Sequence, residues 1–383
     1  MKILMVSMFS SHFFNWTQQL EEAGHEIYWI DVYDSNIYTK RIDFVHQIIG
    51  WRNKTKYPWR YKLKRKFPGI YNFINKFNQR NLADVFEEKL KEIQPDIVQS
   101  FEMFSACVPI LEVIKNHPEI KWIYSVWGND LYFFKNQPKA LKNIKEVFFH
   151  LDYMFADCSR DSKIAHQLGF RGKFLGVYPT GGGYDFKKYD PFIKNFAQRK
   201  IILIKGYQHQ FGRCNKILEA ISRLKERLAD YDIIVFSANT AVIEYTKELR
   251  LNTWKNIMIY EQLPHDKVLK LMGESKIYIG NSISDGMPNT LLEAIIMGAF
   301  PIQSNPGGAT EEIIVDGLNG LLIKNPEDAV EIGDLIQKAI NNKVFLVSGV
   351  EYNNKNVKPK LQREIVKNLV LEKYRLIENK INS

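Results

Sequence analysis

The sequence predicts an α/β protein of two lobes, each with its own sheet of parallel strands. Short apolar runs alternate with segments of helical periodicity along most of the chain, which is typical of parallel strands joined by crossover helices. The chain of 383 residues also exceeds the roughly 250 to 300 residues that one hydrophobic core usually supports. We therefore expect two domains.

The expected strands fall into two sets, one in each half of the chain. In the first half, a helical pattern covers residues 81–93, and the apolar runs cover residues 3–7, 26–30, 96–99, 122–125, 153–156 and 174–176. In the second half, the apolar runs cover residues 201–205, 233–237, 257–260, 277–280, 300–303 and 320–323. Each set is large enough to form a sheet of its own.

A turn-rich stretch separates the two sets. It contains the consecutive glycines Gly181 to Gly183, and a polar, proline-containing segment follows up to Lys200. We therefore assign residues 1–185 to a first lobe, 186–199 to a linker and 200–358 to a second lobe. Residues 361–377 are expected to form one long final helix.

The composition is that of an ordinary globular protein, with 45% hydrophobic and 25% charged residues. The first residues indicate a buried strand rather than a secretion signal, and no stretch reaches the roughly 18 apolar residues that a membrane helix needs. Three scattered cysteines show no disulfide or metal-ligand spacing and suit a reducing compartment: Cys107, Cys158 and Cys214. We expect a cytoplasmic protein.

The formal net charge of +10 indicates acidic partners, and residues 51–80 concentrate this charge. The segment has no Asp or Glu, and its basic residues alternate with aromatic ones. This combination is typical of a segment that lies on an anionic membrane surface, here at the inner face of the membrane. A solvated basic face whose aromatics pack inward is an equally good interpretation. No nucleic-acid motif accompanies the charge, so we expect no nucleic-acid partner.

One segment of the second half carries the features of an anion site. The strand at 277–280 runs into a loop with Gly286, and Pro288 then opens a helix. Amides in the first turn of such a helix point beyond the carboxyl ends of the strands, where the helix dipole favours phosphate. The expected donors are the backbone amides of Asn289, Thr290 and Leu291.

Glu293 lies four residues after Asn289 and therefore shares one helix face with it. The apolar stripe of the same helix should pack on the sheet, which places Glu293 beside a core. A carboxylate in that position needs partners, and the two hydroxyls of a ribose supply them, as in other nucleotide sites. A Glu that caps nearby backbone amides is the alternative.

The same segment resembles glycosyltransferase family 4. The stretch from Asp285 to Glu293 is similar to that family's acidic-x7-Glu motif, with Asp in place of the usual Glu. Further landmarks of the family follow in the correct order at residues 294–298, 300–302, 307–314 and 316–322.

The resemblance implies the GT-B architecture, in which two Rossmann-like lobes face each other across a cleft. The first lobe would bind the acceptor and the second the donor, with a final helix, residues 359–383, packing back on the first lobe. Members are retaining, metal-independent transferases, so no cofactor or metal is expected. Carried over, Glu293 would hold the donor ribose, Asp285 would contact the donor sugar, and the amides after Pro288 would hold the diphosphate.

The family also places cations near the leaving diphosphate, where they stabilise the developing negative charge. The matching region here is displaced by about one residue, and Tyr207 stands where an Arg is usual. Arg213 is the best candidate, followed by Lys205 and Lys216. The first lobe departs further, because Trp127 replaces the usual His. Its remaining candidates for acceptor contacts are His12 and Asp130.

The sequence therefore predicts a hexosyltransferase that moves a sugar from a nucleoside diphosphate, with UDP favoured. The acceptor would be a glycan or a lipid-linked glycan in the synthesis of cell-surface polysaccharide or glycoconjugates. Two alternatives stay open. The fold also suits a sugar-nucleotide epimerase or a transferase to a small soluble acceptor, because a fold does not fix a function. A non-catalytic nucleotide-binding or basic scaffold protein is the other.

Overall fold

The computed structural model describes residues 1–55 and 58–382, so Lys56 and Tyr57 of the basic segment lie outside the described residues. The chain divides into two compact units. The first unit comprises Met1–Ala156, Ser162–Gly182 and Lys367–Ser383, and the second comprises Asp157–Asp161 and Gly183–Val366. We call these units the first and the second lobe.

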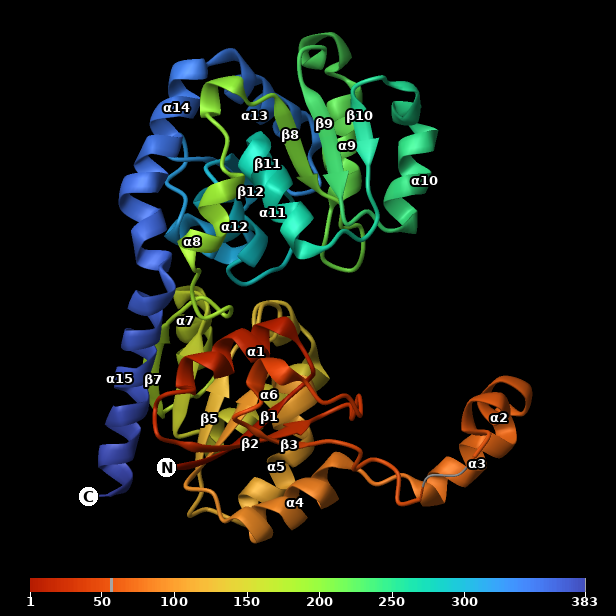
Figure 1. The fold of residues 1–383 in the computed structure, drawn as a ribbon, viewed down its shortest axis with the longest axis vertical. Helices are drawn as coiled ribbons and strands as arrows, with labels where there is room; N and C mark the ends of the chain where they lie inside the picture. The colour runs from red at the N-terminus through yellow and green to blue at the C-terminus, as the bar shows by residue number, and fades with distance from the viewer. Residues whose placement is uncertain (56–57, 383) are drawn as a thin grey trace. The chain divides into compact units, whose positions relative to one another are not determined.

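The first lobe contains a seven-stranded parallel sheet in the order β3-β2-β1-β4-β5-β6-β7 (Figure 1). Its strands are β1 (Lys2–Ser7), β2 (Glu26–Asp31), β3 (His46–Ile48), β4 (Ile97–Phe101), β5 (Lys121–Ser125), β6 (Tyr153–Ala156) and β7 (Lys173–Val177). Strand β4 is buried at every position, as expected for a central strand covered on both faces.

The helices of the first half follow the strands in the alternation that the sequence predicts. They are α1 (Ser11–Thr17), α2 (Arg60–Lys66), α3 (Pro68–Asn78), α4 (Leu82–Ile93), α5 (Val108–Lys115), α6 (Pro138–His150) and α7 (Ser159–Gln167). Helix α4 begins where the side chain of Asn81 accepts a hydrogen bond from the amide of Asp84, and its inner face is apolar.

The second lobe contains a six-stranded parallel sheet in the order β10-β9-β8-β11-β12-β13. Its strands are β8 (Ile201–Lys205), β9 (Asp232–Phe236), β10 (Ile257–Ile259), β11 (Ser275–Gly280), β12 (Phe300–Ser304) and β13 (Leu321–Ile323). The helices are α8 (Phe186–Tyr189), α9 (Cys214–Ser222), α10 (Thr240–Glu248), α11 (His265–Glu274), α12 (Asn289–Ile296), α13 (Ala329–Asn341) and α14 (Lys343–Tyr352). The predicted two-sheet α/β class is confirmed.

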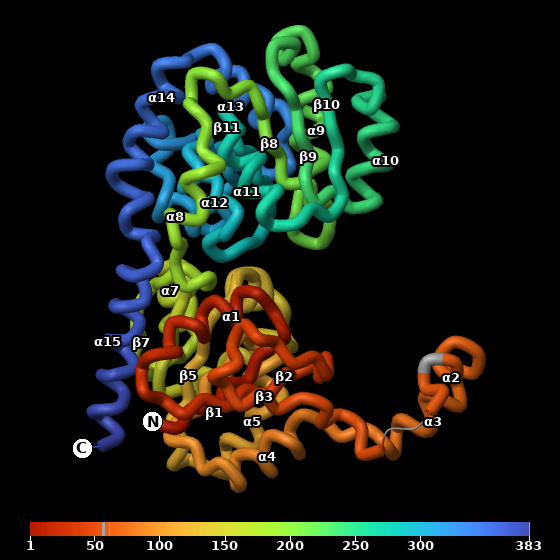
Figure 2. Tube along the Cα trace, in the orientation of Figure 1, coloured from red at the N-terminus to blue at the C-terminus, as the bar shows by residue number. Residues whose placement is uncertain are grey.

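The final helix α15 (Arg363–Ile381) belongs to the first lobe from Lys367 onward (Figure 2). The fully buried Tyr374 fixes it there. The indole of Trp16 donates to the Tyr374 hydroxyl over 3.1 Å, and that hydroxyl donates to the side chain of Gln99 over 2.5 Å. The N-terminal ammonium of Met1 also lies 3.1 Å from the carboxylate of Glu378.

Helices α2 and α3 form a helical hairpin that contacts the rest of the first lobe through a narrow neck. Within the neck, the amide of Arg80 donates to the carbonyl of Arg52, and that of Lys54 donates to the carbonyl of Asn78, both over 2.8 Å. Figure 2 shows the two helices packed on each other and extending away from the sheet of the first lobe. The hairpin therefore buries little apolar surface of its own.

Several boundaries differ from the sequence predictions. All the expected strands are present, but the short edge strand β3 was not predicted, and the hairpin helices were seen only as a basic segment. Residues 186–199 lie within the second lobe, where Phe186, Phe192 and Ile193 pack against buried apolar residues. Among the described residues, no helix is both long enough and apolar enough to span a membrane.

Replacing Tyr374 with Phe is expected to destabilise the first lobe by about 1 to 3 kcal/mol, because it leaves the buried polar groups of Trp16 and Gln99 without their shared partner. Calorimetric melting of the wild type and the variant measures the loss. Tyr38→Phe is the control, since Tyr38 is 54% exposed in the same lobe. Equal melting temperatures for Tyr374→Phe and Tyr38→Phe would contradict the role of this network.

Candidate functional site

The second sheet reverses its strand order between β8 and β11. From β8 the chain moves outward through β9 and β10, and then returns to the other side of β8 as β11. Open parallel sheets bind ligands beyond the carboxyl ends of their strands at such a switch point. Here two loops meet at that point, residues 206–213 after β8 and residues 281–288 after β11.

Backbone hydrogen bonds join these two loops. The amide of Arg213 donates to the carbonyl of Asn281, and the amide of Ile283 donates to the carbonyl of Phe211, each over 2.9 Å. The side-chain amide of Asn281 donates back to the carbonyl of Arg213 at 3.3 Å and to that of Pro326 at 2.8 Å. Since each loop holds the other, the pair forms one preorganised surface.

Helix α12 starts directly after the second loop. Pro288 is its N-cap, with φ −67° and ψ 119°, and not its first helical residue as the sequence suggested. The Pro288 carbonyl accepts from the amides of Leu291 at 3.0 Å and Leu292 at 3.2 Å, so the Leu291 amide is already used. In the described ranges, no acceptor takes the amide of Thr290. This amide stands at the positive end of the helix dipole and can bind an anion.

Glu293 is 9% exposed, and its carboxylate lies 2.7 Å from Nε2 of His265, the first residue of α11. The structure therefore shows a side-chain partner of this carboxylate. The sequence indicated two other kinds of partner, a ribose ligand and nearby backbone amides. The charge of Glu293 also acts on two tyrosines. Burial and then this charge raise the pKa of Tyr184, and the same two causes raise the pKa of Tyr189 to about 12. Because a carboxylate accepts up to about four hydrogen bonds, Glu293 has capacity for a ligand besides His265.

Asp285 and Gly286 lie in the loop after β11, just before the start of α12. The Asp285 carboxylate accepts a hydrogen bond from the Gly286 amide at 3.0 Å. Burial raises the pKa of the Tyr278 hydroxyl, and the charges of Asp285 and Glu293 add to that effect. This hydroxyl donates to the Thr290 hydroxyl over 3.0 Å at the start of α12.

Residues 157–161 hold the loop after β11 in place through hydrogen bonds, and they were not among the residues predicted from the sequence. The buried guanidinium of Arg160 donates to the carbonyls of Asp285 at 2.8 Å and Pro306 at 2.7 Å. The Glu312 carboxylate accepts from the amides of Ser159 at 2.8 Å and Arg160 at 3.1 Å. Polar residues directly after strand β6 were the available signal, because that position lies at a carboxyl strand end.

Gly286 packs so tightly on this support that a side chain would not fit. A Cβ at position 286 would come within 2.3 Å of an Asp157 carboxylate oxygen. The glycine is therefore required by the close approach of the two segments.

Asp157, Cys158 and Asp161 bring three potential metal-binding atoms within 4.8 Å of one another. Their surroundings suit the guanidinium of Arg160 rather than a metal ion. The guanidinium of Arg160 donates to Asp161 at 2.9 Å, and burial raises the pKa of the Cys158 thiol far above its ordinary value. A thiol that resists ionisation is a poor metal ligand, so this cluster reads as the anchor of Arg160.

The three predicted cations have different partners. Arg213 is the N-cap of α9, forms an ion pair with Glu327 and donates to the carbonyls of its own loop, including that of His209 at 3.0 Å. Lys216 pairs with Glu219 at 3.1 Å. In the parts of the chain that the structure describes, Lys205 has no carboxylate partner, and its ammonium lies 4.8 Å from the ring centroid of Tyr207.

His209 lies in the loop after β8, and its ring centroid is 5.5 Å from that of Tyr207. Burial lowers the pKa of His209, the charge of Lys205 lowers it further, and the charge of Asp285 raises it.

The first-lobe candidates are placed differently. His12 is exposed in the first turn of α1, with its ring centroid 6.2 Å from that of Trp127. Asp130 is buried and accepts hydrogen bonds from the Tyr124 hydroxyl at 2.9 Å and from the Met103 amide at 3.0 Å. Burial, with the charge of Glu102, raises the pKa of Asp130. Asp130 therefore joins loops of the first lobe from inside.

The second lobe matches a known protein family. The family model described as glycosyl transferases group 1 matches residues 186–357, which include both loops, α12 and Glu293. Residues 186–357 therefore belong to this glycosyltransferase family.

Two glycosyltransferases of Methanocaldococcus jannaschii, both described as uncharacterised, are similar in sequence. One is 22% identical over 93% of this chain and 94% of its own length. The other is 27% identical over 169 residues, and the match spans 43% of this chain and 43% of that relative. The similarity therefore reaches the first half of this chain as well as the region of the family model.

Solved structures share the fold of both halves. Sucrose-phosphate synthase from Thermosynechococcus elongatus has a TM-score of 0.73 at 13% identity and covers 99% of each chain. Anabaena HepE, solved with UDP, has a TM-score of 0.71 at 12% identity and covers 98% of this chain and all of its own. The lipopolysaccharide outer core galactosyltransferase WaaB has a TM-score of 0.66 at 14% identity, with 98% and 99% coverage. These neighbours establish the GT-B fold of this glycosyltransferase.

Asp157→Asn is expected to flatten the pH dependence of stability. Burial, with the charge of Asp161, raises the pKa of Asp157 from 3.8 to about 8. A carboxyl whose pKa rises on folding stabilises the fold below the unfolded value, and this contribution is lost as the pH climbs toward the folded value. Between about pH 5 and pH 8 the melting temperature of the wild type should therefore fall more than that of the variant.

The control is Asp230→Asn, which changes an exposed carboxylate of the same lobe and should keep the wild-type slope. Parallel curves for the wild type and Asp157→Asn would show that this carboxyl ionises as easily in the folded protein as in the unfolded chain.

Proposed function

We propose that this chain transfers a hexose from a nucleoside-diphosphate sugar, with a UDP-sugar favoured, to a glycan or lipid-linked glycan acceptor. The transfer would retain configuration at the sugar and need no metal, in the synthesis of cell-surface polysaccharide or glycoconjugates. The observation that carries this proposal is the pair of joined loops at the β8/β11 switch point, with the start of α12 and Glu293 beside them. The UDP complex of the structural neighbour HepE supports the choice of nucleotide.

Each part of the donor has a suitable partner in this lobe. The amides at the start of α12, Thr290 foremost, would bind the diphosphate, because they combine donor groups with the positive helix end. Glu293 would accept from the ribose hydroxyls, since a nearly buried carboxylate prefers two such donors to water. Asp285 would accept from hydroxyls of the transferred sugar, close to the Gly286 turn.

Lys205 is the cation best prepared to stabilise the leaving diphosphate. Arg213 and Lys216 already neutralise Glu327 and Glu219, whereas Lys205 contacts only an aromatic ring among the described interactions. Negative charge grows on the diphosphate as the glycosidic bond breaks, so an unneutralised ammonium there stabilises the transition state more than the bound substrate. Arg213 would act mainly by holding the loop that presents Lys205.

Glu293→Gln is expected to weaken UDP binding by about 10- to 100-fold, because the charged acceptor of the ribose is lost while the size of the side chain is kept. Asp285→Asn should lower turnover more than donor binding, by roughly 10²-fold in kcat. Calorimetric titration with UDP and initial rates with a UDP-sugar measure the two effects. Glu226→Gln, an exposed site of the same lobe, should match the wild type.

The same assay separates the alternatives. Wild-type turnover across donors and acceptors supports transfer, conversion of the donor to another sugar nucleotide supports an epimerase, and binding without turnover supports a scaffold. Unchanged binding in Glu293→Gln together with unchanged turnover in Asp285→Asn would refute the assignment of these residues.

We further propose that the chain works in the cytoplasm, against the inner membrane face, through the helical hairpin. The large side chains of Trp59, Phe67, Phe73 and Phe77 are between 55% and 68% exposed, although Trp51 is buried in the core of the lobe. These rings lie on α3 or at the ends of α2, in a segment without Asp or Glu. The ammonium of Lys62 lies 4.1 Å from the Trp59 ring centroid. Exposed rings next to unpaired positive charge favour an anionic lipid surface over an inward-packed face.

Replacing four exposed cations of α2 with Ser should weaken binding to anionic vesicles by on the order of 10²- to 10³-fold, because each contributes about 1 kcal/mol near such a surface. The substituted residues are Lys62, Lys64, Arg65 and Lys66. Flotation with vesicles containing an anionic phospholipid measures the effect, and vesicles of neutral phospholipid give the baseline.

A variant with the same loss of charge on the second lobe is the matched control and should float like the wild type. Its substitutions, all to Ser at exposed positions, are Lys225, Arg227, Lys247 and Lys255. Equal flotation of the wild type and both variants would refute membrane binding through the hairpin. The proposed donor site would not be affected by that result.

A further inference from the structure

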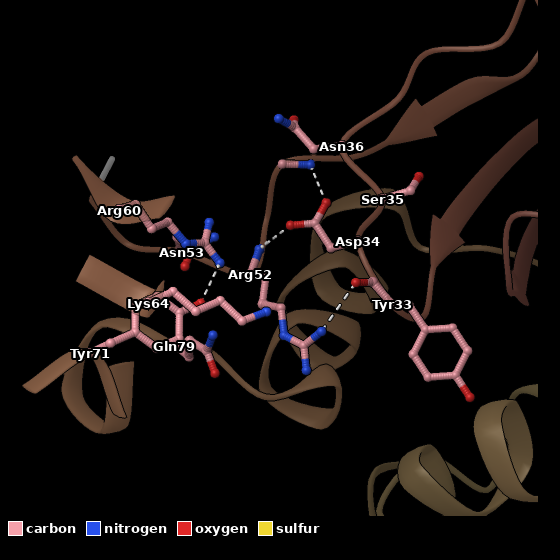
Figure 3. Close-up of a pocket in the computed structure, with 11 residues that line it drawn as sticks. Tyr33, Asp34, Ser35, Asn36, Arg52, Asn53, Arg60, Lys64, Tyr71 and Gln79 are labelled. Carbon is pink, nitrogen blue, oxygen red and sulfur yellow. Dashed lines mark hydrogen bonds between the residues drawn. The ribbon is translucent and has the colours of Figure 1, made fainter. Parts of the chain in front are cut away.

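A cavity of about 510 Å³ lies at the base of the helical hairpin, far along the chain from the donor residues. One wall comes from the loop after β2, with Tyr33, Asp34 and Asn36, and the other from the hairpin and its neck (Figure 3). The hairpin side supplies Arg52, Arg60, Lys64, Tyr71 and Gln79.

Positive charge dominates this cavity. In residues 1–55 and 58–382, none of the lining cations Arg52, Arg60 and Lys64 forms an ion pair with a carboxylate. The one lining carboxylate, Asp34, is already engaged, because it accepts from the amides of Gly50 at 2.5 Å and Arg52 at 2.8 Å. Figure 3 shows the bond between the Arg52 amide and the Asp34 carboxylate.

Two of the cations are oriented by weak contacts that a ligand can replace or share. The guanidinium of Arg52 donates to the carbonyl of Tyr33 at 3.2 Å, and that of Arg60 lies 3.5 Å from the hydroxyl of Tyr71. The ammonium of Lys64 lies 6.0 Å from the centroid of the same tyrosine ring. The hydrogen bond from Arg60 lowers the pKa of Tyr71, and the charge of Lys64 lowers it further, as expected for a phenol beside two cations.

The chemistry of these side chains matches a phosphate group. Guanidinium groups offer paired donors that fit phosphate oxygens, an ammonium adds a point charge, and a phenol adds a neutral donor. The volume exceeds what a bare phosphate needs. The exposed rings of the same hairpin, among them Trp59 and Phe67, supply an apolar surface next to the polar cavity.

We propose that this cavity binds the phosphate group of an amphiphilic molecule, a phosphate ester carried on a lipid, whose hydrocarbon lies along the exposed rings of the hairpin. The inference deepens the proposed function and rests on it where it names the lipid-linked acceptor as the physiological ligand. The binding site itself stands on the first lobe alone.

Decyl phosphate below its micelle concentration is a suitable probe, with inorganic phosphate and decyl glucoside as its head-only and tail-only counterparts. Decyl phosphate should bind the full chain at least about tenfold more tightly than either counterpart in calorimetric titrations. If inorganic phosphate binds as tightly as decyl phosphate, the hydrocarbon does not contribute and the ligand is not an amphiphile. If decyl glucoside binds as tightly as decyl phosphate, the cavity does not recognise the phosphate group.

Lys64→Gln and Arg60→Gln should each weaken decyl phosphate binding by roughly 10- to 100-fold, the usual range for a charge-assisted hydrogen bond. Lys76→Gln is the matched control, since it removes the same charge from an exposed position of α3 in the same hairpin, outside the cavity lining. It should bind within about twofold of the wild type. Equal losses in Lys64→Gln and Lys76→Gln would reduce the effect to general charge attraction and refute a built site.

A separate measurement distinguishes this inference from the proposed function. Slow hydrolysis of a UDP-sugar by the wild-type chain, without any amphiphile, reports on the donor site of the second lobe. Donor hydrolysis without decyl phosphate binding would reject the cavity alone, whereas decyl phosphate binding without donor binding or hydrolysis would reject the glycosyl transfer alone.

Discussion

The candidate donor site depends on the mutual hydrogen bonding of two loops at the reversal of the second sheet. Neither residues 206–213 after β8 nor residues 281–288 after β11 contain a helix or strand that would fix their shape. The exchange of backbone bonds between Arg213 and Asn281, and between Ile283 and Phe211, removes that freedom before any ligand arrives. A preorganised surface then loses less entropy when a ligand binds.

This constraint also explains how the charges are divided. The guanidinium of Arg213 pairs with Glu327 and donates to carbonyls of its own loop. The guanidinium of Arg160 donates to the carbonyls of Asp285 and Pro306. Both arginines therefore shape the surface from behind. Lys205 keeps its charge available, and Asp285 and Glu293 keep carboxylate oxygens for hydroxyl donors. In the proposed function, Asp285 and Glu293 keep the roles that the sequence indicated, and Lys205 takes the role for which the sequence favoured Arg213.

Most of the fold could be predicted because strand and helix periods are local properties of the chain. The final helix, the two sets of parallel strands and the loop-to-helix step at Pro288 all follow from such local patterns. Strand β3 could not be predicted, since its three residues form a strand only by pairing with β2. The ion pair of Arg213 with Glu327 is likewise a tertiary contact across more than a hundred residues, so the sequence could not show that Arg213 already has a carboxylate partner.

The support beneath the loop was missed for the same reason. Nothing in the run Asp157 to Asp161 indicates that Arg160 reaches the carbonyl of Asp285, and Gly286 reveals its tight packing only in three dimensions. The basic segment, residues 51–80, was in contrast recognised from the sequence. Its charge was visible in the sequence, but the burial of Trp51 and the exposure of Phe73 were decided by the fold of the hairpin.

A crystal structure of the chain with bound UDP tests the central claim most directly. The account predicts that the diphosphate accepts a hydrogen bond from the amide of Thr290 at the start of α12, and that the ribose hydroxyls donate to the carboxylate of Glu293. Nucleotide bound at any other place, with the joined loops empty and His265 still the partner of Glu293, would contradict it.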